Sequence, residues 1–116
     1  MDEQLAIVYE DNHLLVVNKP AGMLVQGDNT GDLSLVDHAK HYIKKRYNKP
    51  GNVYLGLPHR IDRPTSGIVV LAKTSKALSR LNKQFSSRET KKTYWAVVKK
   101  PTPADAGELI HYLKKN

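Results

Sequence analysis

The chain has 116 residues, of which 40% are hydrophobic, and this size and composition fit one domain with its own core. It has no cysteine, which excludes disulfides and thiolate sites, and it has no run of about 18 apolar residues, so no membrane span is expected. The formal net charge is +8, which favours an anionic partner.

The positive charge is concentrated in the second part of the chain. Residues 1–72 contain 8 Lys+Arg and 8 Asp+Glu, whereas residues 73–116 contain 11 Lys+Arg and 3 Asp+Glu. A basic segment of this kind is typical of a nucleic-acid-binding surface, although a solvated lysine-rich surface would have the same composition. Residues 1–4 are acidic and no apolar signal-peptide core follows them, so we expect a cytoplasmic protein.

The amino-terminal part is predicted to form two strands and a helix. Residues 5–9 and 14–18 are apolar runs separated by a polar tight turn, the pattern of two adjacent strands. Ser34 and Asp37 stand three residues apart and form an acidic version of the capping box at a helix start. Apolar side chains then recur at helical spacing and predict a helix over residues 35–47.

The second part is predicted to continue with strands and one more helix. The β-branched run at residues 68–72 predicts a buried strand, and Thr74 or Ser75 is expected to cap the helix that follows it. The exposed face of that helix carries basic side chains: Lys76, Arg80, Lys83 and Arg88. Alternating side chains at residues 91–99 predict a further strand, and residues 109–113 a last one. This order predicts an α+β fold, a mostly antiparallel sheet with two packed helices.

The loop at residues 59–67, with the sequence HRIDRPTSG, leads directly into the predicted strand at residues 68–72. Asp62 therefore stands on a loop close to the core, where binding and catalytic groups are commonly placed. Arg60 and Arg63 on either side favour its ionised form and attract phosphate. The simpler alternative is a structural turn, because Asp, Thr and Gly are common turn residues and surface charge pairs are usually weak.

Two other segments have a recognisable order of residues. The sequence KPAG at residues 19–22 follows an apolar strand, and KKTYWAVV occupies residues 91–98. Together with HRIDRPTSG, these segments resemble the RluA-type family of RNA pseudouridine synthases, whose signature is HRLD, two variable residues and TSG. Within that signature the chain departs from the family only at Ile61, where leucine is usual. Lys19 on the KPAG segment forms either a structural turn or an RNA contact.

The resemblance implies part of a pseudouridine synthase catalytic domain, an isomerase acting on uridines of rRNA or tRNA. Asp62 matches the family's catalytic aspartate, which acts as a nucleophile or a base, and Tyr94 matches the active-site tyrosine that stacks on the base. Arg60 matches the arginine that helps to hold the flipped nucleotide. Arg63 and Lys73 are expected to contact RNA phosphate or to form ion pairs. The isomerisation requires no cofactor and no metal, and the five histidines show no metal-site spacing.

The family's catalytic domain continues to a Thr-Gly-Arg-x-His-Gln-Ile-Arg type of segment, which supplies another basic active-site residue and has no counterpart in this sequence. We therefore expect residues 1–116 to be a catalytic domain incomplete at its C-terminus, without turnover as an isolated chain and prone to self-association through open edges. The alternative function is a non-catalytic RNA-binding module that retains the synthase fold. A hydrolase using Asp62 alone is a third alternative, but glycosidases need a second carboxylate and none is recognisable nearby.

Overall fold

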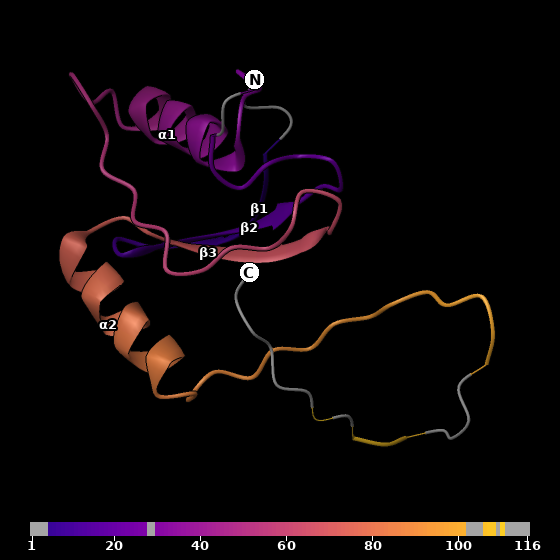
Figure 1. Cartoon of the computed structure of the whole chain (residues 1–116). Coiled ribbons are helices and arrows are strands. Elements are labelled where there is room, and N and C mark those ends of the chain that lie inside the picture. Colours follow the sequence, from indigo (N-terminus) through magenta and orange to yellow (C-terminus); the bar gives the residue numbers. More distant parts are fainter. Residues whose placement is uncertain (1–4, 28–29, 102–105, 109, 111–116) are drawn as a thin grey trace.

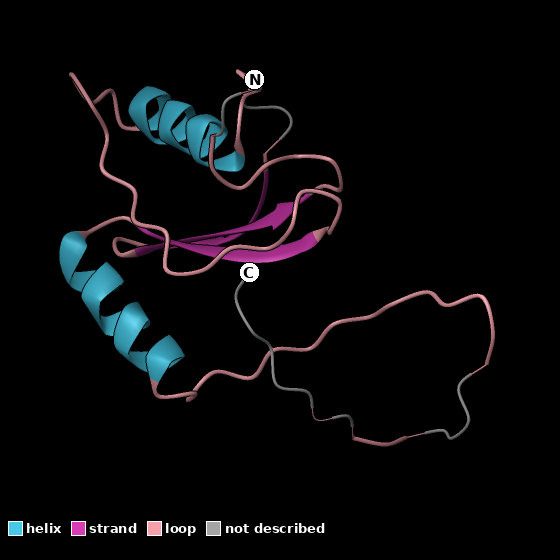
Figure 2. Cartoon of the chain, in the orientation of Figure 1, coloured by secondary structure: helices cyan, strands magenta, loops and turns pink. Residues whose placement is uncertain are grey.

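The computed structural model describes residues 5–27, 30–101, 106–108 and 110. Its helices and strands are β1 (Ala6–Glu10), β2 (Leu14–Lys19), α1 (Leu35–Arg46), β3 (Gly67–Ala72) and α2 (Ser75–Ser86). The strands form one antiparallel sheet in the order β1-β2-β3 (Figures 1 and 2). The α+β class and the antiparallel sheet predicted from the sequence are therefore confirmed.

Both helices begin where the sequence predicts them, because their first turns are capped by local side chains. The Ser34 hydroxyl accepts a hydrogen bond from the Asp37 N–H, and the Asp37 carboxylate accepts one from the Ser34 N–H, which completes the capping box of α1. Thr74 caps α2, since its hydroxyl accepts a hydrogen bond from the Ala77 N–H.

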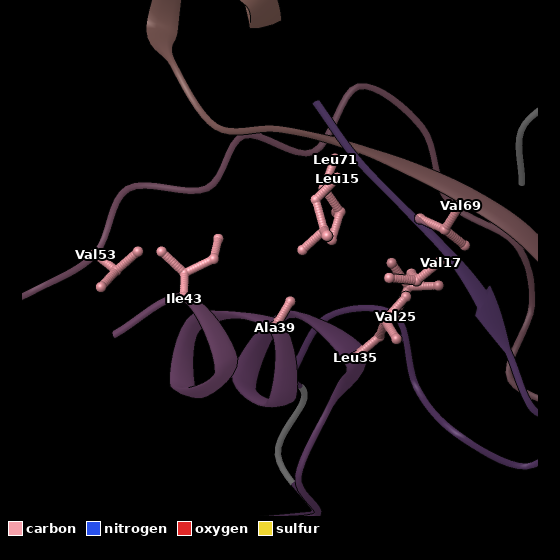
Figure 3. Packing of buried hydrophobic residues seen from close by; sticks show 9 residues of the cluster. All are labelled: Leu15, Val17, Val25, Leu35, Ala39, Ile43, Val53, Val69 and Leu71. Atoms are coloured by element: carbon pink, nitrogen blue, oxygen red, sulfur yellow. The ribbon is translucent and has the colours of Figure 1, made fainter. Parts of the chain in front are cut away.

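One face of the sheet packs against α1 and forms the core. Side chains of a strand alternate between the two faces, and those of β2 and β3 that point toward α1 are fully buried: Leu15, Val17, Val69 and Leu71. They meet the apolar face of α1, formed by Leu35, Ala39 and Ile43 (Figure 3). Burial of this face holds β3 in place, and the HRIDRPTSG loop leads directly into β3.

The second helix lies on the other side of the sheet from α1 (Figure 1). The chain approaches α2 closely at Gly56, where an added Cβ atom would lie 2.8 Å from Leu78 Cδ2, so any side chain there would force Leu78 to move. The sheet face on this side is more open, with Val8 and Ile68 exposed. Neither described helix is long and apolar enough to cross a membrane.

The strand predicted at residues 91–99 is not formed, and this prediction is wrong. Residues 91–98 have no regular secondary structure, and the Trp95 side chain is 96% exposed. An alternating sequence becomes a strand only when a neighbouring strand satisfies its backbone hydrogen bonds, and no described strand pairs with this segment. The strand predicted at residues 109–113 lies, apart from Ile110, outside the described residues.

Candidate active site

The loop that carries Asp62 is attached at its base to the outer edge of β3. The Gly56 N–H donates to the Ala72 carbonyl (2.8 Å), and the Ala72 N–H donates to the Gly56 carbonyl (2.9 Å). Further along, His59 Nε2 accepts a hydrogen bond from the Val70 N–H at 3.0 Å. The chain entering the loop is thus held beside the strand that leaves it.

The tip of the loop rests on the KPAG segment. The Arg63 carbonyl accepts hydrogen bonds from the Gly22 N–H (2.8 Å) and from Lys19 Nζ (3.0 Å), and Arg63 Nε donates to the Gly22 carbonyl (2.8 Å). Lys19 is fully buried, and its ammonium also donates to the carbonyls of Pro20 (3.0 Å) and Met23 (2.6 Å). Burial and the nearby Arg63 charge lower the pKa of Lys19. The structural alternative for Lys19 is therefore confirmed.

Asp62 lies between these two attachments, and its side chain is exposed. The Asp62 carbonyl accepts a hydrogen bond from the Thr65 N–H at 3.0 Å, which closes a turn behind it. Gly67, where the loop enters β3, has a φ of +147°, a backbone conformation that favours glycine. Among the described residues, none donates a hydrogen bond to the Asp62 carboxylate. The described residues thus hold the backbone of Asp62 and leave its carboxylate available to a ligand.

The two arginines beside Asp62 contact other groups. Arg60 is exposed and donates to Gln26 Oε1 at 2.6 Å. Arg63 forms an ion pair with Asp32, with 2.7 Å between Nη2 and Oδ2. Within the part of the chain that is described, neither arginine pairs with Asp62. Arg63 thus forms an ion pair in this structure, and its contact with RNA phosphate stays a prediction. Arg60 is held by a neutral amide that a phosphate could replace.

A cleft of about 630 Å³ lies beside the loop. Loop residues 65–67, the open face of β3 and residues 90–95 line it, and Phe85 of α2 contributes to its wall. Tyr94 lines the same cleft and is 63% exposed. The structure therefore brings Tyr94 and part of the Asp62 loop to one cleft, but Asp62 itself is not among the lining residues, and no strand carries Tyr94 there. The catalytic roles of both residues stay predictions.

Lys73 lies at the opposite end of β3 from the loop. Its ammonium forms an ion pair with Glu10 (2.8 Å) and donates to the Asp11 carbonyl (2.8 Å). The Glu10 carboxylate also accepts the hydroxyls of Tyr42 (2.7 Å) and Tyr47 (2.6 Å). The Lys73 and Glu10 side chains are only 11% and 13% exposed. The ion-pair alternative is confirmed for Lys73, and the structure does not bring this residue to Asp62.

The Glu10 cluster predicts a specific loss of stability in acid. Burial alone would raise the pKa of Glu10, but hydrogen bonds from Lys73, Tyr47 and Tyr42 outweigh it and lower the pKa from 4.5 to about 2. A lowered folded-state pKa stabilises the fold fully above the unfolded-state value, and this contribution is lost as the pH falls from 4.5 to about 2. We expect it to be about 2–3 kcal/mol.

Urea unfolding of the wild type and of Glu10→Gln between pH 7 and pH 2 measures this contribution. The variant should be less stable at pH 7 and should lose less stability across the acid window. Equal losses in the two proteins would show that another carboxylate is responsible.

The partners of two side chains that hold the loop, Lys19 and His59, were not predicted from the sequence. Lys19 continues the alternation of the buried Leu15 and Val17 on β2, so its position toward the core could have been found from the strand period. The contact from His59 to Val70 has no comparable signal, because its partner belongs to a strand on the far side of the loop.

The comparison with known families agrees with this arrangement. A family model described as RNA pseudouridylate synthase matches residues 13–115, which include the KPAG segment, the Asp62 loop and Tyr94. The chain belongs to this family. Its relatives among pseudouridine synthases place it with the RluA type.

Individual relatives of the family can be compared over most of this chain. It is 38% identical over 109 residues to the dual-specificity RNA pseudouridine synthase RluA of Haemophilus influenzae, covering 94% of this chain and 47% of that protein. It is 41% identical over 92 residues to the ribosomal large subunit pseudouridine synthase C of Buchnera aphidicola subsp. Acyrthosiphon pisum, covering 79% of this chain and 27% of that protein.

A solved structure of the family has the same fold. The human RNA pseudouridylate synthase domain containing 4 matches with a TM-score of 0.61 and 30% sequence identity, over 72% of this chain and 30% of the human chain. The chain spans 27% to 47% of the length of these pseudouridine synthase relatives.

Proposed function

We propose that this chain carries the catalytic aspartate of an RNA pseudouridine synthase, which isomerises specific uridines of rRNA or tRNA. One observation carries the proposal: the Asp62 carboxylate, to which no described residue donates a hydrogen bond, stands on a loop held at its base by His59 and at its tip by Lys19. Family membership and the activities for which the relatives are named support the same reaction. We also infer that residues 1–116 belong to a single catalytic domain.

The reaction breaks the N1–C1′ bond of uridine, turns the base and joins C5 to C1′. Asp62 supplies the ionised carboxylate at the ribose, either as a nucleophile toward C1′ or as a base for the C2′ proton. Tyr94, exposed in the cleft, stacks on the uracil and assists the loss of the C5 proton. The reaction is an isomerisation in which N1 gains the proton that C5 loses, so it needs no cofactor, metal or co-substrate.

The uridine must leave its stack before the carboxylate can reach the ribose, at a cost of a few kcal/mol. Arg60 takes the space that the base vacates, exchanging its hydrogen bond with Gln26 for contacts to RNA. Arg63 is exposed and can exchange Asp32 for a phosphate. Lys73 is assigned to the fold instead, because its ammonium is held by Glu10.

Tritium release from RNA labelled at C5 of uridine tests the proposed function. The protein is expressed from its complete natural reading frame and incubated separately with bulk rRNA and bulk tRNA. We expect time-dependent release from at least one of them. Binding of both RNAs without release would contradict the isomerase and would identify the chain as a non-catalytic RNA-binding module with the synthase fold.

The basic face of α2 is expected to contribute to RNA affinity. The side chains of Lys76, Arg80 and Lys83 are exposed, and none forms an ion pair with a described carboxylate. Each phosphate neutralised by a cation adds about 0.7 to the log–log salt slope for single-stranded RNA. Replacing all three by Gln should therefore flatten the slope by about 2.

A matched control removes three exposed lysines from the region of α1, namely Lys40, Lys44 and Lys49. Both triple variants lose the same net charge, so a change confined to the α2 variant identifies a contact surface rather than a general charge effect. Filter-binding isotherms from 50 to 300 mM salt measure the slopes. Equal slopes in the α2 variant and the wild type would show that this face does not touch RNA.

We further infer that the protein acts in the cytoplasm and self-associates. Apolar side chains remain exposed on the open sheet face and in residues 91–98, among them Val8, Ile68 and Val98. Covering such surface in a second copy is favourable. Light scattering should give a mass above that of the monomer, and a monomer at all concentrations tested would contradict this inference.

A further inference from the structure

The His59 side chain joins three parts of the molecule. His59 is the first residue of the Asp62 loop. Its Nε2 accepts a hydrogen bond from the Val70 N–H at 3.0 Å, and its ring stacks on the Phe85 ring of α2 with 4.9 Å between the ring centroids. The Val70 N–H faces the outer edge of β3, as does that of Ala72 two residues later, which pairs with Gly56. His59 thus takes the place of a backbone carbonyl at this edge.

This contact requires one protonation state of the ring. A nitrogen that accepts a hydrogen bond carries a lone pair, so the proton of the neutral imidazole is on Nδ1 when Nε2 accepts from Val70. The imidazolium form carries a proton on both nitrogens. Protonation of His59 would therefore set two N–H groups against each other and remove the hydrogen bond.

We propose that His59 is a positioning residue, which in its neutral form clamps the entrance of the Asp62 loop to β3 and on protonation releases it. The clamp itself follows from the geometry of His59, Val70 and Phe85. Its consequence for catalysis rests on the proposed isomerase function, because Asp62 lies three residues beyond the clamp on the same loop.

The surroundings of the ring favour the neutral form. Burial lowers the pKa of His59, and the positive charge of Lys92 lowers it further. The residues of β3 and α2 that contact the ring, Val70 and Phe85, are uncharged. The Lys92 ammonium lies 5.2 Å from the centre of the Phe85 ring. Arg60 and Asp62 are its charged neighbours in the loop. Release is therefore expected at a lower pH than for a histidine with its ordinary pKa.

Two substitutions separate three properties of His59: the hydrogen bond that Nε2 accepts, the stacking of its ring on Phe85, and its protonation. His59→Gln keeps an acceptor near the position of Nε2 and cannot be protonated in this range. His59→Phe keeps an aromatic ring against Phe85 and removes the acceptor. Circular dichroism and urea unfolding establish that each variant is folded before it is compared.

Amide hydrogen exchange of the full chain, corrected for the intrinsic effect of pH, reads the clamp without any activity. In the wild type the protection of the Val70 amide should fall about tenfold as His59 is protonated, while Leu71, whose N–H faces β2, keeps its protection. His59→Gln should retain Val70 protection across that range, and His59→Phe should lack it at every pH. Unchanged Val70 protection in His59→Phe, or pH-independent protection in the wild type, would overturn the clamp.

Tritium release measured against pH reads the catalytic consequence. We expect kcat of His59→Phe to fall about tenfold to a hundredfold with little change in KM, because loop misplacement of about 1 Å can cost about a hundredfold. His59→Gln should recover most of kcat and lose the acid limb that His59 produces. A working clamp with kcat unchanged in His59→Phe would overturn the positioning role, whereas absence of all activity would contradict the proposed function and leave the exchange result to decide the clamp.

Discussion

Asp62→Asn is expected to abolish pseudouridine formation while leaving the fold and RNA binding intact. The substitution keeps the size of the side chain and removes the charge that either mechanism requires. A positioned carboxylate acting on a proton in the transition state contributes about 10²–10⁴ in rate, so tritium release should fall by at least about a hundredfold. No described residue hydrogen-bonds the Asp62 carboxylate, so its removal should leave the unfolding free energy within about 0.5 kcal/mol of wild type.

Asp32→Asn provides the matched control for this experiment. Asp32 is also exposed, and it forms an ion pair with Arg63, which lies on the Asp62 loop. The variant therefore loses the same charge from the same region. An exposed ion pair contributes about 0.2–1 kcal/mol, and we expect the Asp32 variant to retain most of its tritium release. Near-normal release by Asp62→Asn would refute the catalytic assignment. Equal loss in both variants would point to general electrostatics instead.

Lys19→Met is expected to produce the largest loss of stability among single substitutions in the loop region. Methionine has nearly the same length and shape but cannot donate to the carbonyls of Pro20, Met23 and Arg63. Each buried carbonyl that loses its donor costs about 1–3 kcal/mol, although the Arg63 carbonyl keeps the Gly22 N–H. We expect the free energy of unfolding to decrease by about 3–5 kcal/mol.

Urea unfolding measures this loss, with Lys40→Met as the control. Lys40 lies exposed on α1, so its replacement should change the unfolding free energy by less than about 0.5 kcal/mol. A stabilising solution condition should recover part of the free energy of unfolding that Lys19→Met loses, but it does not restore the hydrogen bond to the Arg63 carbonyl. Activity should therefore remain reduced. A stability equal to wild type would show that the three carbonyls find other donors.

The sequence by itself determined the elements that depend on neighbours in the chain. The capping box of Ser34 and Asp37 and the cap at Thr74 act over three residues, so their positions follow directly from the order of residues. The apolar run that became β3 is recognisable for the same reason, and three continuous segments, KPAG, HRIDRPTSG and KKTYWAVV, predicted the family.

Only the tertiary structure decided what depends on distant partners. Residues 91–98 have the alternation of a strand, but strand formation needs a paired neighbour, and no described strand is one. Lys73 carries the charge expected of a phosphate contact, yet Glu10, far away in the sequence, holds its ammonium in an ion pair. The buried ammonium of Lys19 and the acceptor nitrogen of His59 likewise received their roles from backbone groups that folding brings to them, because a hydrogen bond depends on position in space and not on order in the chain.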